Sequence, residues 1–202
     1  MRTKVFVLLA CFFLLATCLC ACQNRVHHND TNEIDPSVWK SAYLQIVESK
    51  KDINKKFALV YVDADNIPEL YILGSSEAEG DMIYSYKDGE IVELHLARMF
   101  GGKYVERSGK IINQSGHMGN YIEYVYVLDD HGFTRILNAS YTERIEEQEN
   151  GEHTVIREYF IDGETVSEAD YHNAVNSSFD ISMSDELYTK SVSYDDIKKQ
   201  LS

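Results

Sequence analysis

The chain has 202 residues, and its 19 Lys and Arg against 33 Asp and Glu give a formal net charge of −14. A protein this acidic repels phosphate groups, which excludes nucleic acid as an expected partner. All four cysteines fall within the first 22 positions, the last of them being Cys22. A disulfide framework, a thiol nucleophile and a cysteine-ligated zinc site are therefore not expected in the remainder of the chain.

The N-terminal segment has the layout of a secretory signal. Arg2 and Lys4 provide a basic start, and an unbroken apolar run follows from Val5 to Leu15. The segment ends in LCAC, closing at Cys22, which resembles the lipobox of bacterial lipoproteins. The resemblance implies that Cys22 receives a diacylglyceryl group, that cleavage occurs before it, and that the protein is anchored through this lipid to the cell membrane, on its extracytoplasmic face. An uncleaved anchor over Val5–Cys22 and a freely secreted product stay open as alternatives.

Cleavage before Cys22 divides the chain into three expected parts: a signal peptide (1–21), a tether (22–35) and a single extracytoplasmic domain (36–202). The tether is expected because residues 23–35 are polar and show no periodicity. The mature chain then carries 17 basic and 33 acidic residues, a net charge of −16. Its 181 residues suffice for one sizeable hydrophobic core.

A helix is expected at the start of this domain. Asp35 can cap the helix, and Pro36 suits its first turn, where a missing N–H costs no hydrogen bond. Trp39, Tyr43 and Val47 then recur at helical spacing. The pattern predicts a helix from Pro36 to about residue 51, with its aromatic side chains packed in the core.

Strands follow, because after Lys56 the apolar period changes to two and turns rich in glycine separate the segments. Ser167 and Ser193 each stand three positions before an acidic residue, a capping-box variant that predicts two C-terminal helices. Residues 180–190 are expected to be irregular or a short helical turn. The expected strands are 57–62, 70–73, 82–86, 90–96, 103–106, 110–114, 120–128, 133–145 and 154–161.

The order of these elements predicts the fold class. Regular alternation of strands and helices, which a parallel sheet needs, does not occur in the pattern. We therefore predict an α+β fold: an N-terminal helix, one antiparallel meander sheet of about six to eight strands, and C-terminal helices. A partly rolled sheet is an open variant of this prediction.

An acidic turn joins the first two expected strands. Asp63 and Asp65 stand two residues apart at a strand end, and Glu69 follows just past the turn. Three carboxylates in a compact loop suit calcium, which prefers hard oxygen ligands, so these residues are a candidate calcium site. The spacing is not that of an EF-hand, because the required acid, Gly and Glu are missing at positions 5, 6 and 12. The alternative is an Asx-type turn in which Glu69 pairs with a lysine or a backbone donor.

Several motifs together resemble a group of small lipoproteins from gut-type Gram-positive bacteria. They are the D-x-D-x-IPEL turn that begins at Asp63, the YSYKDG hairpin of residues 84–89 and the DG-x-x-VS-x-x-x-Y helix entry that ends at Tyr171. The resemblance covers residues 36–96 and 158–178. It implies the extracytoplasmic location and the order of elements. The group has no established activity, so the resemblance supplies no catalytic residue.

Tyrosine is frequent, with 14 residues, and part of this set is expected at the surface. Tyr124 and Tyr126 share one face of their expected strand, opposite Tyr121. Together with Tyr84 and Tyr86 they are the candidate surface for a peptide or glycan ligand. The alternative is packing at the edge of the core, with buried rings and solvated hydroxyl groups.

Three functions are compatible with these features. The first is a membrane-anchored, non-catalytic binding or interaction module whose partner is an envelope protein, a peptide or a glycan. The second is an extracytoplasmic hydrolase, or an accessory or inhibitor of one, although neither a GxSxG nor an HExxH motif occurs. The third is a structural envelope domain stabilised by calcium. We assign no catalytic residue, and calcium is the sole cofactor under consideration.

Overall fold

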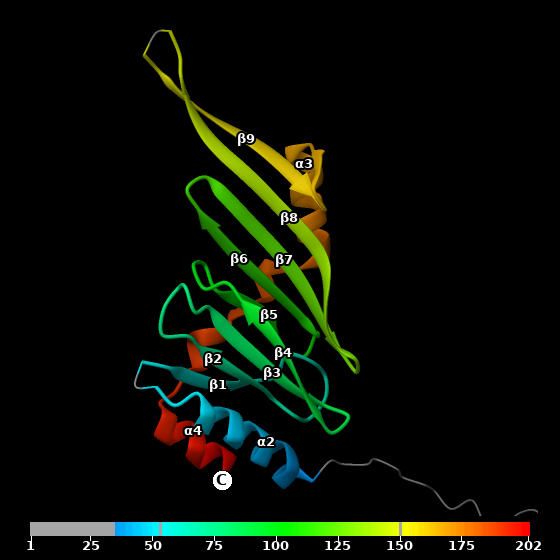
Figure 1. Cartoon of the computed structure of the whole chain (residues 1–202). Coiled ribbons are helices and arrows are strands. Elements are labelled where there is room, and N and C mark those ends of the chain that lie inside the picture. Colours follow the sequence, from blue (N-terminus) through cyan, green and yellow to red (C-terminus); the bar gives the residue numbers. More distant parts are fainter. Residues whose placement is uncertain (1–34, 53, 150) are drawn as a thin grey trace, which may run out of the picture. The chain divides into compact units, whose positions relative to one another are not determined.

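The computed structural model of the chain describes residues 35–52, 54–149 and 151–202 (Figure 1). Cys22, the expected signal peptide and residues 22–34 of the expected tether lie outside these described residues. Among the described residues, no helix is both long and apolar enough to cross a membrane. The described fold begins at Asp35, one residue before the expected start of the domain.

The first helix, α2 (Pro36–Ser49), forms as the sequence predicts. The carboxylate of Asp35 accepts a hydrogen bond of 2.9 Å from the Ser37 N–H, and Pro36 occupies the first turn. Three side chains of α2 are buried, and the Trp39 and Tyr43 rings meet edge to face at 5.6 Å. The expectation that these aromatic residues pack in the core is confirmed.

The first sheet has four antiparallel strands in the order β1-β2-β3-β4. Its strands are joined in chain order, and the β3–β4 hairpin turns at Asp88 and Gly89, both with positive φ. Each strand therefore pairs with its neighbour in sequence, as a meander requires. The four strands are β1 (Lys56–Val60), β2 (Glu69–Leu73), β3 (Asp81–Lys87) and β4 (Glu90–Leu96).

The second sheet has seven antiparallel strands in the order β10-β9-β8-β7-β6-β5-β11. The pairing of β7 with β8 shifts by one residue between Val125 and Tyr126, which marks a β-bulge. Beyond Thr142, β8 pairs with β9 but no longer with β7. The strands are β5 (Gly102–Val105), β6 (Lys110–His117), β7 (Asn120–Asp129), β8 (Gly132–Glu147), β9 (His153–Ile161), β10 (Glu164–Val166) and β11 (Asp185–Glu186).

The C-terminal part contains α3 (Glu168–Ser178) and α4 (Tyr194–Leu201). The Ser167 side chain accepts a hydrogen bond from the Asp170 N–H, and the Ser193 side chain accepts one from the Asp196 N–H. Both predicted caps are therefore confirmed. In Figure 1, α3 lies along β8 and β9, and α4 lies beside α2. The intervening segment contains the short 3-10 helices η1 (Ile181–Met183) and η2 (Leu187–Lys190), in agreement with the expected irregular stretch.

Three clusters of buried side chains show how the layers pack. The first lies between the helices α2 and α4 and one face of the four-stranded sheet. The second lies between the two sheets, and the third between the seven-stranded sheet and α3. The layer order is thus helices, sheet, sheet, helix. This architecture confirms the α+β class, with the strands divided into two sheets where the sequence pattern indicates one.

The division into two sheets depends on the segment between β4 and β5. The buried Asn113 side chain of β6 accepts a hydrogen bond from the Ala97 N–H at 2.9 Å and donates to the carbonyls of Ala97 and Gly101. These bonds hold the crossing chain against the second sheet. The alternation of apolar residues in the sequence does not predict this crossing, because the side chain that holds the crossing segment belongs to β6, a different strand.

Candidate functional site

The acidic turn after β1 brings its three carboxylates together. One ligand oxygen from each of Asp63, Asp65 and Glu69 lies within 4.8 Å of the others. The convergence follows from local sequence, since Asp63 and Asp65 share one turn and Glu69 begins the returning strand β2. The geometry is compatible with a cation ligand set, and the partners of each carboxylate decide how available it is.

Asp63 and Asp65 are already bound to Lys87, at the end of β3. The Lys87 ammonium, on a side chain only 8% exposed, contacts the Asp63 carboxylate and lies 2.7 Å from Asp65 Oδ2. The other oxygens cap the turn, because Asp63 Oδ1 accepts from the Asp65 N–H and Asp65 Oδ1 accepts from the Ile67 N–H at 2.7 Å. The turn thus contains the Asx-type bonds of the alternative interpretation and carries its own cation.

Glu69 is fully buried and faces the same turn. Its carboxylate accepts hydrogen bonds from the Val62 N–H at 2.7 Å and from Ser85 Oγ at 3.1 Å. Burial raises the pKa of Glu69 to about 8, and the nearby Asp63 charge acts in the same direction. Glu69 therefore retains a proton near neutral pH, which makes it a poor cation ligand there. Calcium binding at this turn stays a prediction.

The tyrosines predicted as a binding surface do not lie on one surface. Tyr84 and Tyr86 are only 4% and 6% exposed and belong to the core beneath α2 and α4, so the prediction of an exposed role for these two is wrong. The physical reason is that the inward-facing residues of β3 are covered by α2. Tyr126 packs against the core between the sheets. Tyr124 is half-buried, and the Arg135 guanidinium carbon lies over its ring, 4.8 Å from the ring centroid.

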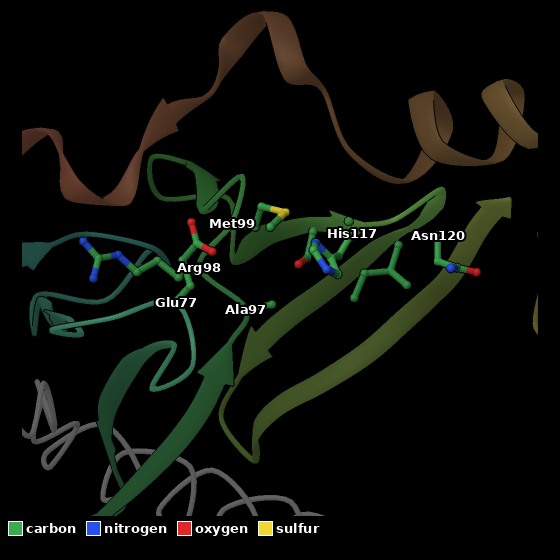
Figure 2. A pocket seen from close by; sticks show the side chains of 9 residues that line it. Glu77, Ala97, Arg98, Met99, His117 and Asn120 are labelled. Carbon is green, nitrogen blue, oxygen red and sulfur yellow. The ribbon is translucent and has the colours of Figure 1, made fainter. Parts of the chain in front are cut away.

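One pocket lies where the chain crosses between the sheets (Figure 2). Its volume is about 310 Å³, and Figure 2 shows Arg98 and Met99 of the crossing segment together with His117 of the β6–β7 hairpin. The Arg98 guanidinium donates to the Gly74 carbonyl and lies 3.9 Å from the buried Asp81 carboxylate. The charge of Arg98 is therefore already used within the protein and is not available to an anionic ligand in this pocket.

A second concavity, the aromatic groove, lies between α3 and the seven-stranded sheet. It consists of two adjoining hollows of about 340 Å³ and 120 Å³, which share Gln114, Glu123 and Tyr141 in their walls. The larger hollow is within the size range of small-ligand pockets. The groove residues come from β6, β7, β8, β9, α3, the crossing segment and η1.

The groove takes its name from a run of neighbouring rings. The register pairs Tyr121 of β7 with Tyr141 of β8, and Tyr141 with Tyr159 of β9, so all three point to the face covered by α3. Tyr121 and Tyr141 stack at 4.5 Å, and Phe100 of the crossing segment stacks on Tyr121 at 6.4 Å. Tyr171 of α3 meets Tyr159 at 5.0 Å, which completes the run on the helix side.

A close approach at β6 permits this stacking. Gly116 pairs with Tyr121, and a Cβ added at Gly116 would lie 2.2 Å from a Tyr121 ring carbon. The Tyr121 ring therefore lies across the glycine and extends the aromatic run toward Phe100. Any larger residue at position 116 would push the ring out of the stack.

Carboxylates accept hydrogen bonds from two tyrosine hydroxyl groups of the groove. Tyr171 Oη donates to Glu123 Oε2 at 2.9 Å, and Tyr159 Oη donates to Glu168 Oε1 at 2.9 Å. Gln114 also donates its amide proton to Glu123. Burial, followed by the Glu123 charge, raises the pKa of Tyr171, which keeps this hydroxyl protonated.

The aromatic groove is not among the sites that the sequence pattern predicts. The predicted placement of Tyr121 opposite Tyr124 is correct, but Tyr141, Tyr159 and Tyr171 are not among the predicted site residues. A symmetric hairpin around the β7–β8 turn would pair Tyr121 with Ser140, and the β-bulge shifts the partner to Tyr141. The aromatic run therefore depends on one extra residue in β8, for which the alternation pattern gives no signal.

No family model, curated protein or solved structure matches this chain.

Proposed function

We propose that the protein is a membrane-anchored extracytoplasmic lipoprotein that acts as a non-catalytic binding module, with the aromatic groove as its ligand-binding surface. The observation that carries the proposal is the run of rings from Phe100 through Tyr121 and Tyr141 to Tyr171, with carboxylates beside it. Aromatic rings provide rigid apolar contact area at low cost in conformational entropy, and nearby polar groups orient the ligand.

The anchor rests on the lipobox-like sequence that ends at Cys22 and on the resemblance to small lipoproteins of Gram-positive bacteria. If the chain is anchored in this way, an anionic membrane surface would repel its acidic domain. A Cys22→Ser chain tests the anchor by cell fractionation and by mass spectrometry of the N-terminal peptide. A product that is still cleaved at the same bond and still membrane-bound would contradict lipidation.

The hydrolase alternative receives less support from the groove. A hydrolase needs an acid or base held close to the reacting bond. The closest His–carboxylate approach in the groove joins His172 and Glu168 at 3.8 Å, but their side chains are 57% and 64% exposed on α3. Solvent competes for such groups, which favours a binding role for the surface over catalysis.

The groove is tested by titrating the full chain, purified in a neutral detergent, with a panel of short peptides and oligosaccharides. We expect at least one class to bind, and Tyr141→Leu to weaken that binding about tenfold because it interrupts the aromatic run. Tyr188→Leu is the matched control, since Tyr188 is 49% exposed in η2 and does not line the groove. A ligand whose affinity is unchanged by Tyr141→Leu would place binding elsewhere and sink the proposal.

A structural domain stabilised by calcium remains the second candidate, because the three acidic side chains of the turn converge. Calcium would have to displace the Lys87 ammonium and release the proton of Glu69. Calorimetric titration with millimolar calcium, together with the melting temperature, tests this candidate. Absence of heat and of any rise in melting temperature would remove it.

A further inference from the structure

We propose that the occupant of the aromatic groove is a cationic group on an aliphatic stem, specifically the lysine side chain of a peptide. The inference rests on the proposed function, since it names the ligand class of that same groove. Three properties of the groove carry it: the balance of charge, the direction of the hydrogen bonds and the arrangement of the rings.

The first property is the balance of charge. Glu123 and Glu168 line the groove, and so do Arg157 and His172, whose Nε2 lies 3.8 Å from Glu168 Oε1. The Arg157 guanidinium is bound to Glu143, with Nε at 2.9 Å and a terminal nitrogen at 2.8 Å from Glu143 Oε2. The positive charge of Arg157 is thereby balanced outside the groove lining. Among the described residues that line the groove, neither carboxylate is therefore paired with a lysine or an arginine, in a chain whose net charge of −14 itself attracts cations.

The second property is the direction of the hydrogen bonds. Three polar groups of the groove donate hydrogen bonds to its carboxylates: the hydroxyls of Tyr171 and Tyr159 and the side-chain amide of Gln114. A carboxylate accepts up to about four hydrogen bonds, so Glu123 and Glu168 keep acceptor capacity after these contacts. These two carboxylates thus offer free acceptor positions to a ligand that lies in the groove. An ammonium group, with three donors and no acceptor, complements such a surface, whereas an anion does not.

The third property is the arrangement of the rings. Tyr141, Tyr159 and Tyr171 pack against one another, with their centroids 5.0 to 6.1 Å apart, and they form one wall of the hollow that Glu123 and Glu168 also line. Aromatic faces attract cations within about 6 Å, and more strongly as water is removed. Apolar side chains line the same hollow and suit a methylene stem: Ile112, Val175 and Ile181. A lysine side chain combines this stem with the charge that the rings and carboxylates favour.

The experiment uses the full chain in a neutral detergent and the blocked peptide acetyl-Gly-Lys-Gly-amide. Shifts of ¹³C-labelled tyrosine ring signals report binding even when the affinity is weak. The same peptide acetylated on its lysine keeps the stem but loses the charge. We expect the acetylated peptide to bind about tenfold more weakly. We also expect added salt, from about 0.05 M to about 0.5 M, to weaken the lysyl peptide.

Variants locate the interaction. Glu123→Gln should lower the affinity for the lysyl peptide about tenfold, because it removes one groove charge at constant shape. Glu93→Gln is the matched control, an exposed carboxylate on β4 of the other sheet, and should leave the affinity unchanged. Glu168→Gln provides a second variant with little risk to folding, since the side chain is 64% exposed.

Each remaining outcome overturns the inference in a recognisable way. Equal binding of the acetylated peptide, or salt-independent binding of a neutral oligosaccharide that Tyr141→Leu abolishes, would leave the groove as a binding site with a neutral ligand. Tighter binding of spermidine than of the lysyl peptide would indicate a free polyamine as the source of the cation. Failure of every probe to shift the groove tyrosines would contradict the inference and the proposed function together.

Discussion

Lys87 balances the acidic turn from a strand more than twenty residues away in the sequence. We expect Lys87→Met to destabilise the fold by about 3 kcal/mol, because it leaves Asp63, only 12% exposed, without its counter-charge. The cost should lie at the lower end for a buried pair, since Asp65 is 38% exposed and water screens its charge. Urea denaturation at neutral pH measures the free energy of unfolding.

Lys103→Met is the control for this variant. Lys103 pairs with Glu186 at 2.8 Å, but the two side chains are 27% and 30% exposed. Removal of such a partly solvated pair should cost less than about 1 kcal/mol. Equal losses in the two variants would show that Lys87 is an ordinary surface lysine.

Glu69 gives the protein a specific dependence on pH. Because its pKa is raised from 4.5 to about 8 in the folded chain, the unfolded chain releases a proton that the folded chain retains. The contribution of Glu69 to stability is therefore complete below pH 4.5 and falls as the pH rises toward about 8. We expect the free energy of unfolding of the wild type, minus that of Glu69→Gln, to fall by up to about 1.4 kcal/mol per pH unit in this window.

Urea denaturation of both chains at intervals of pH between these two values measures the effect. The difference between the chains isolates Glu69 from the many other acidic groups. A difference that stays constant, or that rises with pH, would show that Glu69 is ionised in the folded chain at neutral pH.

At the scale of elements, the β6–β7 hairpin depends on the glycine of its turn. Gly119 has a φ of +79°, and a Cβ at this position would lie 2.3 Å from the Glu143 carbonyl oxygen of β8. Gly119→Ala should therefore destabilise the fold by about 3 kcal/mol or more, since backbone strain and overlap add. Thermal and urea denaturation measure the loss.

Gly163 separates the two contributions. It has a φ of +87°, but nothing lies within 4 Å of its added Cβ. Gly163→Ala should cost about 1 kcal/mol from backbone strain alone. If the two variants lost the same stability, the contact between the Gly119 turn and β8 would be unimportant.

Elements with local causes could be predicted from the sequence. The caps at Asp35, Ser167 and Ser193 lie next to the helices that they start, and Asp-Gly turns lie between the strands that they join. The same reasoning explains why the convergence of Asp63 and Asp65 was predictable: the two residues share one turn. The contact of Lys87 with this turn was not predictable, because the end of β3 faces the turn only once β3 has paired with β2.

The aromatic groove could not be predicted, because its residues meet only through register. Tyr121, Tyr141 and Tyr159 come from three strands, and a one-residue slip in any pairing would turn a ring to the opposite face. The β-bulge after Val125 supplies such a shift. A pattern of alternating residues carries no information on where an exposed extra residue, here near Ile136, enters the strand.

At the scale of the whole molecule, the C-terminal segment joins both sheets. β11 pairs with β5 in the second sheet, and Val192 then bridges to Phe57 in the first. Helix α4 completes the first core cluster with Ile197 and Leu201. The division into two sheets thus depends on contacts between distant segments, which explains why the sequence pattern indicated a single sheet.

Two truncations test this arrangement. A chain that ends at Ser191 should lose about 3–5 kcal/mol or fail to unfold cooperatively, because Ile197 and Leu201 no longer cover the core. A chain that begins at Asp35 should keep the stability of the full chain, since Asp35–Ser202 form a compact unit by themselves. Melting followed by circular dichroism measures both. Equal stability of the two truncated chains would contradict the role given to α4.

The packing of α4 beside α2 also has a consequence for biosynthesis. Glu48 and Lys198 form an ion pair at 3.0 Å, although 150 positions separate them in the chain. During translation, α2 leaves the ribosome long before α4 has been made. Trp39 and Tyr43 therefore lack the α4 side chains, Ile197 and Leu201, that complete their core cluster. Closure over such a distance is slow, and the nascent chain stays open to chaperones until its last helix has been made.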